Sequence, residues 1–154
     1  MATTVELLRG LAIFRELSDE ELAKVAELAV EKSYAAGEHI FHEGEPGNRL
    51  FVIVAGQVRI SRQIPGAGEE ALAVLDPGAM FGEMSVFDRS ERSTDAIAHV
   101  ATRLITIARP EFEMLLDFDR DLAQKVLWAV VRMLSARLRA TNESLRSVMA
   151  LSMF

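Results

Sequence analysis

Apolar residues near the N-terminus recur at the spacing of an amphipathic helix. Leu22, Val25 and Ala29 lie three and four residues apart, which places them on one face of a helix. Ser18 and Glu21 precede this face as a capping box, in which a hydroxyl and a carboxylate satisfy free backbone N–H groups at the helix start. A shorter helix is expected before it. The pattern therefore predicts helices within the first 30 residues.

From about residue 31 to residue 108, glycines alternate with short runs that have the character of strands. Residues 57–62 alternate between polar and apolar, as a half-buried strand does. Residues 65–68 are expected to form a hairpin loop, and Pro77 and Gly78 suit the two central positions of a type II turn. The predicted strands cover residues 39–42, 50–54, 57–62, 71–75, 94–100 and 104–107. Short strands separated by turns predict a sandwich, barrel or jelly roll.

The helical period returns after Arg109. Pro110 suits the first turn of a short helix. A second helix is predicted to begin near residues 119–121, and no glycine or proline interrupts the chain from there to Phe154. Its apolar residues step alternately by four and three, the pattern of a coiled-coil seam: Leu127, Val131, Leu134, Leu138, Thr141, Leu145 and Val148. This stripe predicts a homodimer formed through the C-terminal helix.

Composition narrows the class of protein. The 154 residues suit one domain, and a chain of this size builds a core without disulfides or metals. The absence of cysteine excludes disulfides, thiolate metal sites and a cysteine nucleophile, and it fits a reducing compartment. Neither a signal peptide nor a membrane-spanning run is visible. We therefore expect a cytoplasmic protein that makes no contact with a membrane.

Charge is distributed unevenly. The net charge of −6 argues against non-specific binding of nucleic acid, which needs a basic surface. Residues 1–119 carry 11 basic and 21 acidic side chains, whereas residues 120–154 carry six basic and two acidic ones. We expect a single domain (1–154) with N-terminal helices (1–30), a strand-rich region (31–108) and a hinge with the long helix (109–154).

Residues 81–94 combine groups that suit a nucleotide. Gly82 lets backbone N–H groups approach a ligand closely at the start of a short helix. The Arg92 guanidinium suits two phosphate oxygens, and Ser93 adds a hydroxyl donor. The carboxylate of Glu83 would repel a phosphate but would accept hydrogen bonds from sugar hydroxyls. One carboxylate for a ribose and one arginine for a phosphate together indicate a nucleotide site.

This segment resembles the phosphate-binding cassette of the cyclic nucleotide-binding domain family, to which catabolite activator protein and protein kinase A regulatory subunits belong. Upstream, residues 37–45 and 50–58 are similar to the glycine-anchored hairpins of that family. The likeness extends from Leu11 to about Leu145. It implies an α+β, mainly β fold: an eight-stranded β-roll, which is a double-stranded β-helix of jelly-roll type, flanked by N-terminal helices and a long C-terminal helix.

The resemblance also implies roles for single residues. Glu83 would accept from the ribose 2′-hydroxyl, Arg92 would pair with the cyclic phosphate, and Ser93 would donate to phosphate oxygens together with backbone amides near Ser85. Gly82 would permit the close approach. The other expected ligand-binding residues are Met84, Thr94, and, lining the base pocket, Ile60 and Leu72. The candidates for capping the base from the C-terminal helix are Arg132, Met133, Leu134 and Arg137.

The predicted function is that of a regulatory sensor and not of an enzyme. The ligand would be cAMP or cGMP, and Ser93 favours cAMP because a threonine at this position often accompanies cGMP preference in the family. No cofactor is expected, and the effector protein that responds to the sensor is unknown. Arg92 also has acidic neighbours in sequence, so the alternative is that it forms a surface ion pair and binds no ligand. The alternative function is a dimerisation module with a degenerate pocket.

Two further functions are weighed against the sequence. A metalloenzyme would need clustered histidines, but His39 and His42 are three apart on a predicted strand, so we expect them on opposite faces, and no metal site is predicted. The arginines of the C-terminal helix could contact DNA. The sequence reaches Phe154 without a helix-turn-helix, so we expect no direct DNA binding and a solvated basic face beside the dimer seam.

Overall fold

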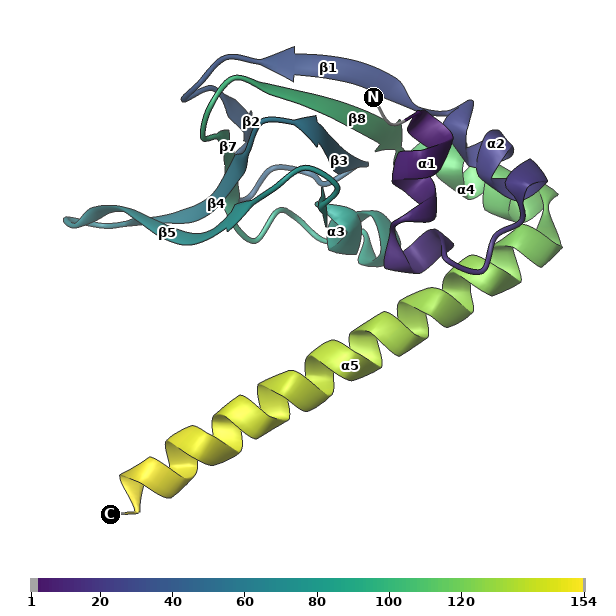
Figure 1. The fold of residues 1–154 in the computed structure, drawn as a ribbon. Helices are drawn as coiled ribbons and strands as arrows, with labels where there is room; N and C mark the ends of the chain where they lie inside the picture. The colour runs from purple at the N-terminus through teal and green to yellow at the C-terminus, as the bar shows by residue number, and fades with distance from the viewer. Residues whose placement is uncertain (1–2, 154) are drawn as a thin grey trace.

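The computed structural model describes residues 3–153 and places N-terminal helices, two sheets and a long final helix in sequence order (Figure 1). The helices are α1 (Thr4–Arg9), the 3-10 helix η1 (Ala12–Phe14), α2 (Asp19–Ala26), α3 (Glu83–Asp88), α4 (Arg109–Phe118) and α5 (Arg120–Ser152). The strands are β1 (Val30–Tyr34), β2 (His39–Phe41), β3 (Arg49–Ala55), β4 (Val58–Ile64), β5 (Gly68–Leu75), β6 (Met80–Phe81), β7 (Asp95–Ala98) and β8 (Thr102–Ala108).

Eight antiparallel strands form two four-stranded sheets within the described residues. One sheet has the order β1-β8-β3-β6 and the other β2-β7-β4-β5. Strands that are neighbours in the sheets are mostly distant in sequence, as in a roll, and this confirms the predicted β-roll with flanking helices. The turn at Pro77 and Gly78 also has the expected form, since Gly78 has a positive φ and Ala79 donates to the carbonyl of Asp76.

Two strands have no counterpart in the sequence prediction. β1 pairs with β8 from Val30 opposite Thr106 to Tyr34 opposite Thr102, yet its residues are mostly polar and exposed. β6 has only two residues, which pair with β3. Both segments are strands because they pair with a neighbouring strand. Neither shows the alternation of polar and apolar residues that predicts a strand from sequence.

The two histidines near β2 do not point to opposite faces. The rings of His39 and His42 stack with their centroids 4.1 Å apart and their planes 3° apart, so the expectation was wrong. β2 ends at Phe41, and its pairing with β7 shifts register between His39 and Phe41. Strand alternation therefore does not extend to His42.

The buried apolar residues form two clusters. The larger one joins the N-terminal helices to α4, to the first turns of α5 and to β3 and β8. The smaller one lies inside the roll and contains Phe41, Phe51 and Phe81, with the rings of Phe51 and Phe81 stacked at 5.0 Å. Phe41 and Phe81 of the smaller cluster also line the site described below. No described helix is long and apolar enough to cross a membrane.

Among the described residues, α5 buries side chains only in its first half. Its N-terminal turns bury Leu122 and Val126, whereas the later turns extend away from the roll (Figure 1). Most of the predicted seam is half exposed or more: Leu127, Val131, Leu138, Leu145 and Val148. Leu134 differs, because it is partly buried against the larger core cluster. No element within residues 3–153 covers this apolar stripe.

Candidate functional site

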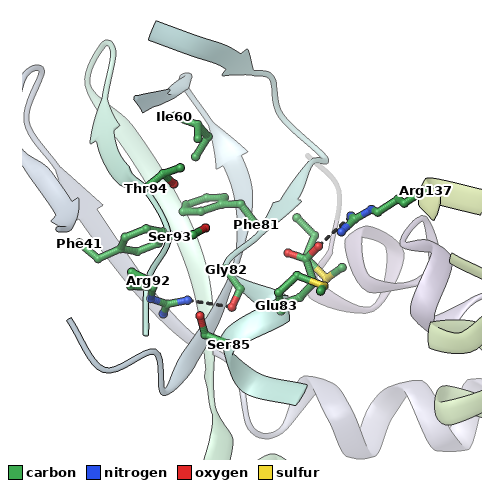
Figure 2. A pocket seen from close by; sticks show the side chains of 12 residues that line it. Phe41, Ile60, Phe81, Gly82, Glu83, Ser85, Arg92, Ser93, Thr94 and Arg137 are labelled. Carbon is green, nitrogen blue, oxygen red and sulfur yellow. Dashed lines mark hydrogen bonds and ion pairs between the residues drawn. The ribbon is translucent and has the colours of Figure 1, made fainter. Parts of the chain in front are cut away.

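A cavity of about 380 Å³ lies between the roll, α3 and α5. It brings together most of the residues that the sequence analysis singled out (Figure 2). The lining residues are Phe41, Ile60, Met80, Phe81, Gly82, Glu83, Met84, Ser85, Arg92, Ser93, Thr94 and Arg137. Residues from β2, β4, β6, α3, the segment before β7 and α5 therefore meet in one place.

Leu72 does not line this cavity. It lies on β5 with 51% of its surface exposed. Ile60 pairs with Ala73 and Ser61 pairs with Ala71, so the register shift between β4 and β5 leaves Leu72 as the residue without a partner. A bulge re-aims the side chains around it, and this removes Leu72 from the position that the resemblance implied.

Arg132 and Met133 are also absent from the cavity. Both line a neighbouring hollow beside Ala12, Arg15 and Glu16, which Arg137 lines as well. They precede Arg137 by about one turn of α5, and only Arg137 reaches both hollows. Of the candidates on α5, Arg137 alone lines the cavity among the described residues.

Gly82 is the N-cap of α3 and has a backbone conformation that favours glycine. Its φ is +76°, and a Cβ at this position would lie 2.8 Å from Nη1 of Arg92. The carbonyl of Gly82 accepts a hydrogen bond from that same nitrogen at 2.8 Å. Gly82 therefore allows both the turn into α3 and the close approach of Arg92.

Arg92 is a buried cation whose position is fixed from several sides. It is 5% exposed, Nη2 donates to the carbonyl of Arg49 at 2.7 Å, and the guanidinium lies 4.2 Å from the ring centre of Phe41. Burial lowers the pKa of Arg92, while the charges of Glu45 and Glu83 oppose that change. Arg92 still keeps its charge at neutral pH, because the ordinary pKa of arginine lies far above 7.

The Nε of Arg92 is buried and has no hydrogen-bond partner. Such a donor costs about 1–3 kcal/mol when it is left unsatisfied, so it indicates that an acceptor belongs there. Arg92 forms no ion pair within residues 3–153, which excludes the surface-pair reading for the part of the chain that is described. The cavity thus contains a cation with donor capacity left over for an anion.

Glu83 is the buried anion of the cavity. It is 4% exposed, and its Oε1 accepts from Nη2 of Arg137 at 2.8 Å (Figure 2). Ser85 is buried in the same first turn of α3, whereas Ser93, which also lines the cavity, is exposed. The Glu83–Arg137 pair joins α5 directly to α3.

Sequence reasoning missed the aromatic part of the site. Phe41 supports the guanidinium of Arg92, and Phe81 lines the wall beside it. Phe41 has the sequence pattern of an ordinary apolar strand residue, and Phe81 opens the segment 81–94 without having been predicted to line the cavity. Gly47 was missed as a site residue too, although it packs against Ser85. No set of three metal-binding side chains is grouped anywhere in residues 3–153.

Comparison with known proteins agrees with this geometry. Residues 31–119 match the family described as the cyclic nucleotide-binding domain, and because the match covers more than half of the chain, the protein belongs to that family. A CRP-like cAMP-activated global transcriptional regulator of Mycobacterium tuberculosis is 31% identical over 140 residues, which are 91% of this chain and 61% of the regulator.

Two further relatives extend the comparison. The crystal structure of the N-terminal domain of a transcriptional regulator from Streptomyces coelicolor A3(2) has a TM-score of 0.78 at 34% identity, over 89% of this chain and 95% of that chain. A cGMP-dependent protein kinase of Drosophila melanogaster is 32% identical over 125 residues, 79% of this chain and 16% of the kinase. The chain therefore spans about three fifths of the mycobacterial regulator and a smaller part of the kinase.

Proposed function

We propose that this protein binds a cyclic purine nucleotide in the cavity between α3 and α5 and acts as a regulatory sensor rather than as an enzyme. The observation that carries the proposal is the buried Nε of Arg92, which lacks an acceptor and shares the cavity with the buried carboxylate of Glu83. A cyclic nucleotide supplies the complement of both groups, since it has an anionic phosphate beside a ribose hydroxyl.

The lining residues divide between the parts of such a ligand. Arg92 and Ser93 provide donors for the phosphate, together with Ser85 at the first turn of α3. Glu83 uses Oε1 for Arg137, so its other oxygen is available to the ribose hydroxyl. The apolar surface that remains for the base comes from Ile60, Met80, Phe81 and Met84.

The ligand would change the position of α5 through Glu83. The same carboxylate would bind the ribose and Arg137, so occupancy of the cavity alters the contact that joins α5 to α3. Movement of the C-terminal helices would then carry the signal to a downstream effector. By thermodynamic linkage, any partner that binds α5 and favours one of its positions must change nucleotide affinity by the same factor.

cAMP is the favoured ligand and cGMP the alternative. The relative named for cAMP and the relative named for cGMP match this chain at similar sequence identity. Overall sequence identity therefore does not favour either nucleotide. The preference for cAMP rests on Ser93. The effector is unknown. Two statements remain predictions: that the chain does not bind DNA directly, and that it is cytoplasmic, the second of which follows from the cysteine-free sequence.

A direct test is calorimetric titration of the protein with cAMP and with cGMP. Saturable binding of either, tighter for cAMP, would support the proposal. No binding of either at millimolar concentration would instead favour the alternative, a dimerisation module with a degenerate pocket, whose specific support is the uncovered apolar stripe of α5.

Arg92→Ala is expected to weaken binding about ten- to a hundredfold, because hydrogen bonds to charged groups contribute about 1.5–3 kcal/mol. Arg62→Ala is the matched control, since Arg62 lies on β4 with its side chain half exposed and outside the cavity. Equal affinities for wild type and Arg92→Ala would contradict the site assignment.

A further inference from the structure

The hollow that Arg137 shares with the candidate site lies between the η1 segment and α5. Its volume is about 380 Å³, the same as that of the cavity beside it. Small side chains leave this space open, since three of its lining residues are alanines: Ala12, Ala129 and Ala136. The hollow is therefore large enough for a small-molecule ligand.

The α5 wall of the hollow is one face of the helix. Ala129, Met133 and Arg137 follow one another at intervals of four positions, and Arg132 and Ala136 are also four apart. This spacing places side chains on one side of a helix. Because η1 packs against α5, the N-terminal segment closes the hollow from the opposite side.

The hollow collects positive charge in an acidic protein. Its lining has three arginines, Arg15, Arg132 and Arg137, against the single carboxylate of Glu16, which gives a net charge of +2 where the whole chain has −6. Within residues 3–153, neither Arg15 nor Arg132 forms an ion pair or a side-chain hydrogen bond, and Glu16 forms none either. The two guanidinium groups are therefore not neutralised by the carboxylate beside them.

Arg137 uses only part of its donor capacity in the cavity. Its Nη2 donates to Oε1 of Glu83 at 2.8 Å, and its other N–H groups have no acceptor in the described part of the chain. A guanidinium has five N–H donors, and this one is half exposed and lines both hollows. Glu83 and an anion in the second hollow would therefore compete for one side chain.

We propose that this hollow is a second ligand site, which binds a small molecule with two or more phosphate groups through Arg15, Arg132 and Arg137. Guanidinium groups bind pairs of phosphate oxygens, and arginines on both walls suit more than one phosphate. The cations surround a hollow instead of forming a stripe along a surface, which favours a small ligand over nucleic acid. The site does not rest on the proposed function, but its effect on nucleotide affinity does.

Occupancy of the second hollow should weaken the binding of cyclic nucleotide. An anion there attracts Arg137 away from Glu83, and the cavity then loses a positive charge that would face the cyclic phosphate. By thermodynamic linkage, the nucleotide must weaken binding of the anion by the same factor. The second ligand would thus oppose the first.

The test is calorimetric titration of the full chain with pyrophosphate and with ADP at constant ionic strength. We expect saturable binding, weakened about three- to tenfold by Arg15→Gln because the side chain is exposed. Tighter binding of ADP would support an organic phosphate as the ligand, and equal binding would support free pyrophosphate. No binding of either at millimolar concentration would overturn the inference.

Arg139→Gln is the matched control, because Arg139 is exposed on α5 and does not line the hollow. Its affinity for pyrophosphate should stay within about twofold of wild type. A loss equal to that of Arg15→Gln would show attraction to the basic helix as a whole and would overturn a defined site.

Crossed variants show which hollow the anion occupies. Arg92→Ala should lose affinity for cyclic nucleotide and keep its affinity for pyrophosphate, and Arg15→Gln should do the reverse. Loss of pyrophosphate binding in Arg92→Ala alone would overturn the inference. If the wild type binds pyrophosphate through Arg15 but binds neither cyclic nucleotide, the proposed function fails and the second site stands.

Titration of pyrophosphate at rising cAMP concentrations tests the two sites in the wild type. The apparent affinity should fall by about two- to tenfold and then level off, as linkage between separate sites requires. Arg137→Gln should remove this coupling, because it removes the side chain that both hollows share. A fall that continues in proportion to cAMP would show competition for one cavity and would overturn the inference.

Discussion

Glu83 and Arg137 lie 54 positions apart in sequence and pair at 2.8 Å across the cavity. With Arg92 they are the three ionisable residues of its lining, so the cavity has two cations and one anion. Without Arg137 the charges of Glu83 and Arg92 would cancel. Arg137 therefore gives the cavity a net positive charge, which suits the anionic ligand proposed above. That Arg137 caps the base stays a prediction.

Arg137→Gln should weaken cyclic-nucleotide binding by about two- to tenfold, a moderate effect because Arg137 is half exposed and the pair is partly screened by solvent. Its removal leaves the buried Glu83 carboxylate without a counter-charge near the phosphate. Arg139→Gln, on the same helix but outside the cavity lining, is the control for calorimetry. Tighter binding by Arg137→Gln would show instead that Arg137 competes with the ligand.

At the scale of elements, α2 and the start of α5 are joined by two reciprocal ion pairs. Glu21 caps α2 together with Ser18 and also accepts from Nζ of Lys125 at 2.6 Å. Asp119 caps α5 and accepts from Nζ of Lys24 at 2.8 Å. Each carboxylate therefore serves one helix and binds the lysine of the other, which fixes the first turn of α5 on the N-terminal helices.

This arrangement predicts a dependence of stability on pH. Although burial raises the pKa of Glu21, its hydrogen bonds with Lys125 and Ser18 lower it below the ordinary value. A carboxyl with a lowered pKa stabilises the fold above its unfolded value of about 4.3 and loses that contribution as the pH falls through the folded value. Lys125→Met should therefore lower the melting temperature at pH 7 and have less effect near pH 3.

Lys32→Met is the matched control for this series, because Lys32 lies on the exposed strand β1 and forms no ion pair in the described part of the chain. Thermal unfolding followed by circular dichroism at several pH values gives the comparison. An equal destabilisation by Lys125→Met at pH 7 and pH 3 would contradict the contribution of the pair.

At the scale of the whole molecule, α5 extends well past the body that it packs against. Its 33 residues correspond to about 50 Å of helix, of which the first half contributes the buried side chains. The exposed stripe of Leu127, Val131, Leu138 and Leu145 keeps heptad spacing along this extension. A second copy of the chain is the partner that this self-complementary pattern suits best.

Leu138→Glu should convert a dimer to a monomer, because it places a charge in the middle of the seam. Light scattering after size exclusion measures the mass directly. Ala140→Glu adds the same charge on the same exposed helix but off the seam, and it should leave the dimer intact. A wild-type protein that is monomeric at every concentration would defeat the heptad argument.

The elements that sequence predicted well are those with a local cause. The capping box at Ser18, the turn at Pro77 and Gly78, and the start of α5 near Asp119 all follow from residues within a few positions of one another. Strand β1 was missed because a polar edge strand is defined by its pairing with β8. The stacked histidines were misread because the register shift in β2 is set by β7.

The sequence by itself determined the order of helices and roll, the apolar stripe of the last helix and the segment around Gly82 and Arg92, since local spacing and residue chemistry encode these features. Only the tertiary structure decided which side chains share the cavity. It added Phe41 to the lining and placed Gly47 against Ser85, because the pairing of distant strands brings these segments together. It retained Arg137 through the pitch of α5 and excluded Leu72 through a bulge. All of these features depend on contacts between segments.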